Sequence, residues 1–406
     1  MQTHTTEQFL NTPQGREADA IVRSCVHCGF CNATCPTYQL LGDELDGPRG
    51  RIYLMKQLLE GKTVSAKTQM HLDRCLSCRS CETTCPSGVE YGRLVDIGRE
   101  LVDKQVVRTG LDRIKRFALR KIMPFPSRFS LFLKTAQKFK AFFPASIKQK
   151  IPNRQEILEW PDKSRIRKML VLEGCAQSII TPNTNSATAS VLDKIGIELI
   201  TANGAGCCGA ISYHLSANEE ALGFMRRNID AWWPLIEEGA EAIVITASGC
   251  GAVVKDYADL LKHDVNYAQK AKIISEKTKD ISEILLQESI DLNRIKISTR
   301  NVVFQSPCSL QHGQKLNGVV ESLLKHYGFN LAQVDNAHLC CGSAGTYSIL
   351  QKELSQQLLE EKLIALQKNA PELIVTANIG CQLHLQTQAN IPVKHWIELL
   401  DESFVA

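Results

Sequence analysis

Sixteen cysteines are the residues of this 406-residue chain whose type and spacing best indicate chemistry. Eight of them form two similar runs, CVHCGFCNATCP at residues 25–36 and CLSCRSCETTCP at residues 75–86. Both runs read C-x2-C-x2-C-x3-C-P, and equivalent positions lie 50 residues apart. Thiolates at this spacing hold 4Fe-4S clusters, because the first three wrap three corners of one cube and the fourth reaches another cube.

The predicted ligand sets therefore cross between the two runs. One cluster takes Cys25, Cys28, Cys31 and Cys85, and the other takes Cys75, Cys78, Cys81 and Cys35. Structural zinc is the alternative, since two C-x2-C pairs can form a tetrahedral site with four sulfur ligands. Zinc gives no reason for the whole run to occur twice, so two 4Fe-4S clusters are the prediction.

The other eight cysteines form a second, less obvious duplication. Its halves are Cys175, Cys207, Cys208 and Cys250, and Cys308, Cys340, Cys341 and Cys381. The offset from the first cysteine to the Cys-Cys pair is 32 residues in both halves. Four thiolates can hold one further cluster in each half. A redox-active thiol pair and reduced buried thiols are the alternatives that the spacing leaves open.

The elements around these cysteines repeat in the same order. In each half an apolar run ends at a cysteine, as in MLVLEGC and NVVFQSPC, and a helical stretch and a short strand lead to Cys-Cys-Gly. A long amphipathic stretch and another strand follow, ending in AIVITASGC and LIVTANIGC. Alternating strands and helices favour parallel α/β units. The cysteines follow the carboxyl ends of strands, where such folds build their sites.

The front of the chain has a helical pattern instead. Apolar residues recur at helical spacing from Ile52 to Leu59, with Pro48 near a helix start, and again from Val89 to Val102. The predicted fold class is therefore α+β and multidomain, with an N-terminal helical ferredoxin-type domain and a duplicated α/β Cys-Cys-Gly domain. The predicted segments are 1–107 for the ferredoxin-type domain, 108–168 for a linker, and 169–300 and 301–406 for the two Cys-Cys-Gly modules.

The segment from Lys104 to Lys168 is basic and rich in Phe. It holds 18 Lys or Arg against four acidic residues, and seven of the 13 Phe. Its prolines, Pro124 and Pro126 among them, exclude one long helix. Two interpretations stay open: a connector whose Phe residues pack on its own domains, or a surface for an anionic membrane or an acidic partner subunit.

Several other residues near the cysteines have weaker patterns. Gly204, Gly206 and Gly209 fit G-x-G-x-x-G, but the two variable positions before the last glycine are the cysteine pair, so dinucleotide binding is not predicted. Small residues there let the backbone approach closely. Four side chains near the Cys-Cys-Gly motifs are candidate hydrogen-bond donors, with a structural role as the alternative: His214, His338, Tyr213 and Tyr347. Arg49 and Arg51 either contact the cluster region or are solvated charges.

The composition is that of an ordinary globular protein. A formal charge of +4 from 47 basic and 43 acidic residues does not favour nucleic-acid binding. The N-terminus has no basic stretch followed by an apolar core, so we expect a reducing cytoplasm, where a Cys-rich chain more often binds metal than forms disulfides. No uninterrupted apolar run is long enough to span a bilayer, so any contact with the cytoplasmic face of the inner membrane is expected to be peripheral.

Taken together, these motifs resemble the iron-sulfur subunits of bacterial glycolate oxidases over essentially the whole chain. The stretches that carry the resemblance are CVHCGFCNATCPTYQLLGDELDGPRGRIYL, NIDAWWP and HLCCGSAGTY, with the two Cys-Cys-Gly modules. The iron-sulfur subunits of anaerobic glycerol-3-phosphate dehydrogenase and of lactate utilisation systems, and the B subunit of heterodisulfide reductase, are similar relatives.

The resemblance implies an oxidoreductase complex acting on CH-OH donors. FAD-binding flavoprotein subunits would oxidise a 2-hydroxy acid, glycolate or D-lactate, and this subunit would carry the electrons to an acceptor such as quinone. No catalytic residue, flavin or NAD is then expected on this chain. The alternative is a self-sufficient disulfide or thiol reductase that uses the Cys-Cys-Gly array.

One departure from the heterodisulfide reductase pattern concerns the last cysteine of each module. That pattern has a C-x2-C pair there, whereas here Ala247 precedes Cys250 and Asn378 precedes Cys381. Each module therefore offers four thiols and lacks the fifth. The unusual noncubane clusters of that relative are not expected here.

Overall fold

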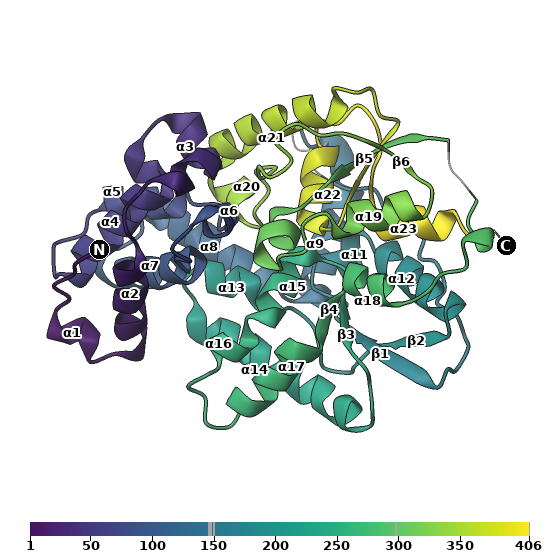
Figure 1. Ribbon diagram of the computed structural model, residues 1–406, viewed down its shortest axis with the longest axis horizontal. Coiled ribbons are helices and arrows are strands. Elements are labelled where there is room, and N and C mark those ends of the chain that lie inside the picture. The colour runs from purple at the N-terminus through teal and green to yellow at the C-terminus, as the bar shows by residue number, and fades with distance from the viewer. Residues whose placement is uncertain (145–147, 149–150, 297–298, 406) are drawn as a thin grey trace.

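The computed structural model of the protein describes residues 1–144, 148, 151–296 and 299–405. The predicted segments 108–168, 169–300 and 301–406 each include a few residues outside these ranges. Figure 1 shows a helical N-terminal region at one end of the molecule and two units with central strands at the other. The predicted fold class, helices followed by a duplicated α/β region, is confirmed.

The N-terminal region consists of short helices around a small apolar core. Pro13 and Pro48 begin helices, where the missing N–H costs nothing. The core includes Val22, Met55 and Leu94, all nearly inaccessible to solvent. The elements are α1 (Glu7–Leu10), α2 (Pro13–Ser24), η1 (Phe30–Thr34), α3 (Pro36–Leu41), η2 (Glu44–Asp46), α4 (Pro48–Leu59), α5 (Ala66–Asp73), α6 (Ser80–Thr84) and α7 (Tyr91–Gln105).

The basic segment begins with two helices instead of one. These are α8 (Gly110–Ile122) and α9 (Pro126–Lys138), followed by η3 (Lys140–Phe142). Pro124 and Pro126 separate them, as expected from the loss of backbone donors. Helix α8 contacts α13 (Ala210–His214), and α9 contacts α11 (Gln177–Ile180), so both lie on the first Cys-Cys-Gly module (Figure 1).

Each Cys-Cys-Gly module is built around a four-stranded parallel sheet. The strand orders are β2-β1-β3-β4 and β6-β5-β7-β8, so the two modules share one topology. The strands are β1 (Arg167–Val171), β2 (Ile197–Ile200), β3 (Ile243–Ile245), β4 (Thr278–Asp280), β5 (Asn301–Gln305), β6 (Asn330–Ala332), β7 (Leu373–Thr376) and β8 (Val393–His395). The register places Leu170 beside Ile243 and Val303 beside Ile374. Edge strands β4 and β8 were not predicted, because their sequences, TKD and VKH, are polar and form no apolar run.

Helices connect and cover the strands of both sheets. The first module contains α11, α12 (Asn183–Lys194), α13, α14 (Asn218–Glu237), α15 (Ser248–Lys255), α16 (Tyr257–Leu260), α17 (Ala268–Lys277), α18 (Ile281–Gln287) and η4 (Leu292–Arg294). The second contains η5 (Ser309–Gly313), α19 (Val319–His326), α20 (Tyr347–Leu350), α21 (Lys352–Gln367), α22 (Ile379–Gln386) and α23 (Trp396–Glu402). Helix α18 begins with a capping box formed by Asp280 and Glu283.

The two modules share one hydrophobic core. A single cluster of buried side chains joins Val171 and Val244 of the first sheet to Val302 and Val375 of the second. Helix α12 packs on α23, and α18 packs on α19. The modules therefore hold the carboxyl ends of their strands in one fixed arrangement, and this arrangement positions the cysteines.

Candidate iron-sulfur centres

The two C-x2-C-x2-C loops share the same unusual backbone. His27 and Ser77 have φ angles of 61° and 51°, and Gly29 and Arg79 have φ angles of 87° and 61°. Residues other than glycine seldom adopt positive φ. The loop therefore imposes this conformation on His27, Ser77 and Arg79 against their own backbone preference. The two turns direct the first three cysteines of each run toward one another.

We call Cys25, Cys28, Cys31 and Cys85 set A. Burial, followed by repulsion from the other three thiols, raises the pKa of Cys31 to about 11. All four line one small cavity. The fourth thiol of the second run thus lies with the first three of the first run. Set A reaches the surface, because Cys28 is exposed and its neighbours Val26 and Phe30 are 68% and 62% exposed.

We call Cys75, Cys78, Cys81 and Cys35 set B, which is more deeply buried. Burial raises the pKa of Cys81, and Cys78, Cys75 and Cys35 all raise it further. The Tyr91 hydroxyl donates to the sulfur of Cys75 over 3.7 Å. The Ser77 N–H donates to the same sulfur over 3.4 Å.

The donor chemistry of sets A and B fits 4Fe-4S clusters. Cys31, Cys78 and Cys81 have raised pKa values and stay protonated at neutral pH, so metal binding is what would convert them to thiolates. Four sulfur donors per set, with N–H and O–H groups directed at the sulfurs, match the way proteins hold such clusters.

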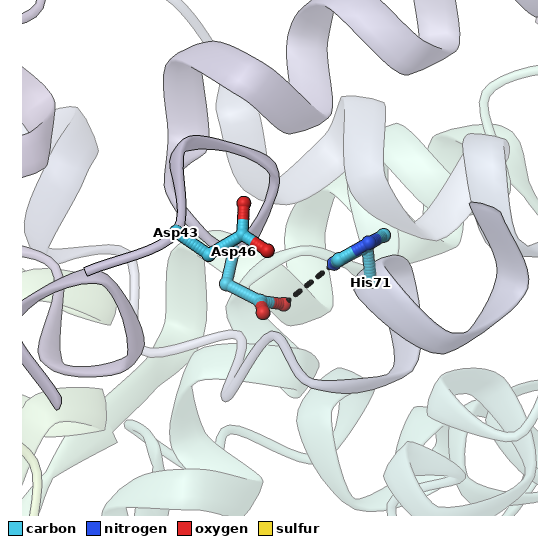
Figure 2. A group of neighbouring side chains, drawn as sticks. All are labelled: Asp43, Asp46 and His71. Atoms are coloured by element: carbon cyan, nitrogen blue, oxygen red, sulfur yellow. Dashed lines mark hydrogen bonds and ion pairs between the residues drawn. The ribbon is translucent and has the colours of Figure 1, made fainter. Parts of the chain in front are cut away.

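A buried ion-pair network centred on Asp46 lies beside Cys35 of set B. Figure 2 shows the contact between Asp46 and His71 within it. Asp46 is fully buried, and its carboxylate contacts Nδ1 of His71 at 3.0 Å and receives a hydrogen bond from Arg74 at 2.7 Å. Arg51 lies 3.4 Å from the same carboxylate. Asp43, Asp46 and His71 have the spacing of a metal site. Two guanidinium groups already neutralise Asp46, so this cluster is an ion-pair network and not a cation site.

Arg51 connects this network to the thiols. It is 1% exposed and donates to the Thr37 hydroxyl, which lies 3.3 Å from the sulfur of Cys35. Burial by itself lowers the pKa of Arg51, but the surrounding acidic groups, led by Tyr91 and Cys75, raise it overall. Arg51 thus contacts the region of set B. Arg49 pairs with Glu44 and lines the cavity of set A beside Gly29.

We call Cys175, Cys207, Cys208 and Cys250 set C, and Cys308, Cys340, Cys341 and Cys381 set D. Within each set the thiols contact one another in that order. The sulfurs of Cys308 and Cys340, for example, are 3.8 Å apart. The structure thus brings together the four thiols that the sequence grouped in each half.

The glycine of each Cys-Cys-Gly motif has a geometric function. Gly209 and Gly342 have φ angles of 91° and 84°. A Cβ on Gly342 would lie 2.6 Å from the carbonyl oxygen of Ser355, and a Cβ on Gly209 would lie 3.0 Å from that of Ala221. Their N–H groups donate to Cys207 and Cys340 over 3.4 Å in both cases. The same turn therefore presents both cysteine pairs.

Asn378 joins set C to set D. Its Nδ2 donates to the sulfur of Cys381 over 3.6 Å, and its Oδ1 accepts the N–H of Gly249 at 3.1 Å. Nearby, the hydroxyls of Ser248 and Ser309 are 2.8 Å apart. The position that lacks the fifth cysteine is thus occupied by a side chain that spans the two modules.

A buried lysine lies beside set D. Lys362 on α21 is 4% exposed and donates to the carbonyl oxygen of Ala337 over 3.1 Å. Burial lowers the pKa of Lys362, while the thiols of set D, led by Cys341, act to raise it. The equivalent side chain on α14 is the neutral Asn228, which donates to the carbonyl of Cys207. Sequence reasoning missed Lys362, because only an alignment of the two halves sets it apart from other helical lysines.

Set B lies directly against set D. Burial, followed by the thiol of Cys308, raises the pKa of Cys78, and Cys78 in turn helps to raise the pKa of Cys340. Leu76 and Tyr347 pack with these cysteines in one buried cluster. Within the part of the chain that the structure describes, the buried hydroxyl of Tyr347 has no hydrogen-bond partner. This hydroxyl therefore lies between two thiol sets and is free to donate.

The other candidate side chains hold the domains together. His214 pairs with Asp96 at 3.3 Å, and Tyr213 accepts a hydrogen bond from Arg93. His338 offers its carbonyl oxygen to His312 at 3.1 Å. His312 in turn contacts the hydroxyl of Thr83 in the second cysteine run at 2.9 Å. Their structural interpretation agrees with these contacts.

A cavity of about 1470 Å³ lies between the ferredoxin-type region and both modules. Cysteines of three sets line it: Cys75, Cys78, Cys175, Cys207, Cys208, Cys250, Cys308, Cys340 and Cys381. Leu119, Ile122, Met123, Phe129 and Phe132 of the basic segment form an apolar part of its wall. Phe132 is also 59% exposed, so it stands at the mouth of the cavity.

Comparison with known proteins gives matches over nearly the whole chain. The model of the 4Fe-4S dicluster domain matches residues 21–89, and that of the cysteine-rich domain matches residues 169–255 and 302–386. The chain is 52% identical over 404 residues to the glycolate oxidase iron-sulfur subunit of Escherichia coli strain K12, covering 99% of both chains. It is 30% identical over 412 residues to a probable glycolate oxidase iron-sulfur subunit of Bacillus subtilis strain 168, covering 94% of this chain and 92% of that one.

A more distant relative matches part of the chain. Lactate utilization protein A of Bacillus velezensis is 26% identical over 246 residues, covering 58% of this chain and 99% of that one. Among the helices of the described residues, none is both long and apolar enough to span a bilayer.

Proposed function

Because this chain belongs to the family of glycolate oxidase iron-sulfur subunits, we propose that it carries electrons from FAD-binding subunits that oxidise glycolate to a quinone in the membrane. The complex is an oxidoreductase, and the electron-transfer role belongs to this subunit. D-lactate is a second candidate substrate. The position of the complex is the cytoplasmic face of the inner membrane.

The proposed division of the chain follows its four segments. Residues 1–107 receive the electrons, 108–168 contact the acceptor side, and 169–300 and 301–406 hold the two Cys-Cys-Gly sites. When bound, the clusters carry single electrons, whereas a flavin accepts a hydride. Sets A and B are the ligands of two 4Fe-4S clusters, and sets C and D are the ligands of further clusters. The residues of this chain hold, orient and shield these groups.

The buried cluster that holds Cys78 together with Cys308 and Cys340 is the observation that carries this proposal. It makes sets B and D neighbours, and Asn378 makes sets D and C neighbours. Exposed Cys28, with Val26 and Phe30 beside it, provides an apolar contact for the flavoprotein at set A. Electrons therefore enter at set A and pass through B and D to C.

Iron, sulfide and zinc analysis with EPR of the anaerobically purified chain tests this proposal. Sets A and B alone require about eight irons per chain, and all four sets about sixteen, at four irons per cluster. We expect Cys31→Ser to remove one ferredoxin-type EPR signal, and Cys208→Ser and Cys341→Ser each to lower the iron content without removing that signal. These variants are controls for one another. A colourless, zinc-containing protein would overturn the proposal.

Co-purification separates the proposal from the self-sufficient reductase. We expect the chain to bind flavoprotein subunits and to be reduced by glycolate only in their presence. Turnover of a disulfide by the isolated chain, without reduction by glycolate in the complex, would favour the alternative.

A further inference from the structure

The helices α8 and α9 present a concentrated apolar surface. Sixteen large apolar side chains in the described residues are more than half exposed, and seven of them lie between residues 107 and 142. These seven are Val107, Leu111, Ile114, Phe117, Leu131, Phe132 and Phe142. A monomeric soluble protein seldom exposes so many large apolar groups in one stretch, so this face is expected to contact a partner.

The same surface is strongly basic. Residues 107–144 contain ten Lys or Arg and one acidic residue, Asp112. On α9, Lys134 and Lys138 are exposed and follow Leu131 at intervals of three and four residues, which places all three on one helical face. Helical faces that combine cations with Leu and Phe are typical of elements that lie in the headgroup region of a membrane.

Ion pairs on the opposite side fix this surface on the body of the protein. Arg116 is buried and pairs with Asp73 at 2.9 Å and with Asp112 at 2.9 Å. Lys121 pairs with Glu220 of the first module. Asp112, the one acidic residue between residues 107 and 144, thus pairs with a buried arginine, and the charges that remain exposed on this surface are positive.

The basic surface lies beside set C and at the mouth of the cavity. Phe125, between α8 and α9, packs in one cluster with Cys175, Cys207 and Phe224. Its ring is 5.6 Å from that of Phe224. Phe129 and Phe132 line the cavity, and Phe132 reaches the outer surface. An apolar path thus connects the α8–α9 face to the last thiol set of the proposed relay.

We propose that the α8–α9 face binds an anionic lipid bilayer and opens the cavity beside set C to a lipophilic acceptor in that bilayer. This inference rests on the proposed function for the identity of the acceptor, but the lipid contact is independent of electron transfer. Phosphate headgroups pair with the exposed cations, while Leu and Phe side chains enter the acyl boundary.

The geometry favours a bilayer over an acidic protein subunit. An acidic partner would need only the cations, and the exposed Phe and Leu residues would still face water. A bilayer takes up both groups on one plane, and it also holds the lipophilic acceptor at the mouth beside Phe132. Each Lys or Arg near an anionic surface contributes about 1 kcal/mol, so reversal of several charges weakens binding steeply.

Flotation of the anaerobically purified full chain with vesicles tests the lipid contact. We expect binding to vesicles of phosphatidylcholine with about one quarter phosphatidylglycerol, weaker binding at high salt, and at least about tenfold weaker binding to phosphatidylcholine alone. The triple variant Arg113→Glu, Lys134→Glu, Lys138→Glu should lower the partition coefficient at least about tenfold. The triple variant Leu111→Ser, Ile114→Ser, Phe117→Ser should lower it similarly.

Matched controls make the same changes at exposed positions elsewhere. Lys62→Glu, Lys67→Glu and Lys352→Glu repeat the charge change. Val265→Ser, Leu286→Ser and Ile364→Ser repeat the loss of exposed apolar groups. These controls should bind vesicles like the parent chain. Iron content and reduction of a water-soluble dye by the assembled complex should stay unchanged in all variants, which shows that they fold.

Three results would overturn the inference. The first is equal vesicle binding by the α8–α9 variants and their controls, and the second is no vesicle binding by the parent chain. The third is loss of flavoprotein binding in the α8–α9 variants, since that would identify the face as a subunit interface. If glycolate does not reduce even the water-soluble dye, the proposed function is wrong. The flotation result would still decide whether the α8–α9 face binds lipid.

Discussion

At the scale of single residues, hydrogen-bond donors and a cation around the thiols stabilise negative charge on the sulfur atoms. Tyr91 donates to Cys75, Asn378 donates to Cys381, and buried Lys362 places a positive charge beside set D. Donors and cations near a cluster stabilise its reduced form and raise its potential. Tyr91 and Lys362 are buried, so their hydrogen-bond partners offset the cost of removing their polar groups from water.

Tyr347 provides a test at this scale. Its buried hydroxyl lies near Cys75 and Cys340, so we expect it to donate to a cluster sulfur and to raise that potential. Removing a net hydrogen bond of about 1 kcal/mol corresponds to a decrease of about 40 mV in a one-electron couple. Redox titration of Tyr347→Phe by EPR should show this decrease. Tyr213→Phe is the control, because Tyr213 already accepts from Arg93; an unchanged potential in Tyr347→Phe contradicts the role.

At the scale of elements, the turn after each cysteine pair depends on one glycine. The positive φ of Gly342 and its approach to Ser355 leave no space for a methyl group, and Gly209 is less constrained. Strand and helix lengths vary between the two halves, but this turn does not. The turn therefore determines where the paired thiols lie relative to the strand ends.

Alanine substitutions at three glycines measure this constraint. We expect Gly342→Ala to destabilise the protein by about 2–3 kcal/mol and to release iron from set D, because strain and a backbone clash add. Gly209→Ala should cost about 1–2 kcal/mol, from the positive φ alone. Gly223→Ala, in the exposed face of α14 with open space around it, should raise stability by up to about 1 kcal/mol. Thermal melting and iron analysis under anaerobic conditions measure the order of stability of the three variants. Equal effects at all three sites would refute the predicted order.

At the scale of the whole molecule, one side chain joins the ends of the two sheets. His395 is 1% exposed, its Nε2 donates to the carbonyl oxygen of Thr246 at 2.9 Å, and its Nδ1 accepts the N–H of Ile397 at 3.2 Å. The bond accepted by Nδ1 requires the neutral ring, because both nitrogens of a protonated imidazole are donors. Burial lowers the pKa of His395 from 6.5 to about 4.

This shift predicts a pH dependence of stability. Between pH 6.5 and about 4 the unfolded chain binds a proton at this position and the folded chain does not. Stability is therefore retained above pH 6.5 and falls as the pH decreases toward 4, by at most about 3 kcal/mol. The melting temperature of His395→Gln should depend less on pH in this window than that of the parent chain. His263→Gln, at an exposed position, should behave like the parent; a parent-like profile for His395→Gln would count against the assignment.

The sequence by itself determined which cysteines could act together. Covalent spacing sets which thiols share a loop, so the two C-x2-C-x2-C-x3-C-P runs and the repeated offset of 32 residues predicted four groups of four thiols. The structure brings these groups together, while iron binding stays a prediction. The apolar runs predicted six of the eight strands and the α/β class, because periodic burial leaves a local pattern.

Only the tertiary structure decided how these groups are arranged in space. Nothing local indicates that Cys78 packs in one cluster with Cys308, that Asn378 spans the two modules, or that Lys362 is buried. These contacts arise from packing between segments more than 100 residues apart in several cases, and such packing leaves no pattern along the chain. The order of the proposed relay and the position of the cavity mouth therefore depend on the fold and not on any single motif.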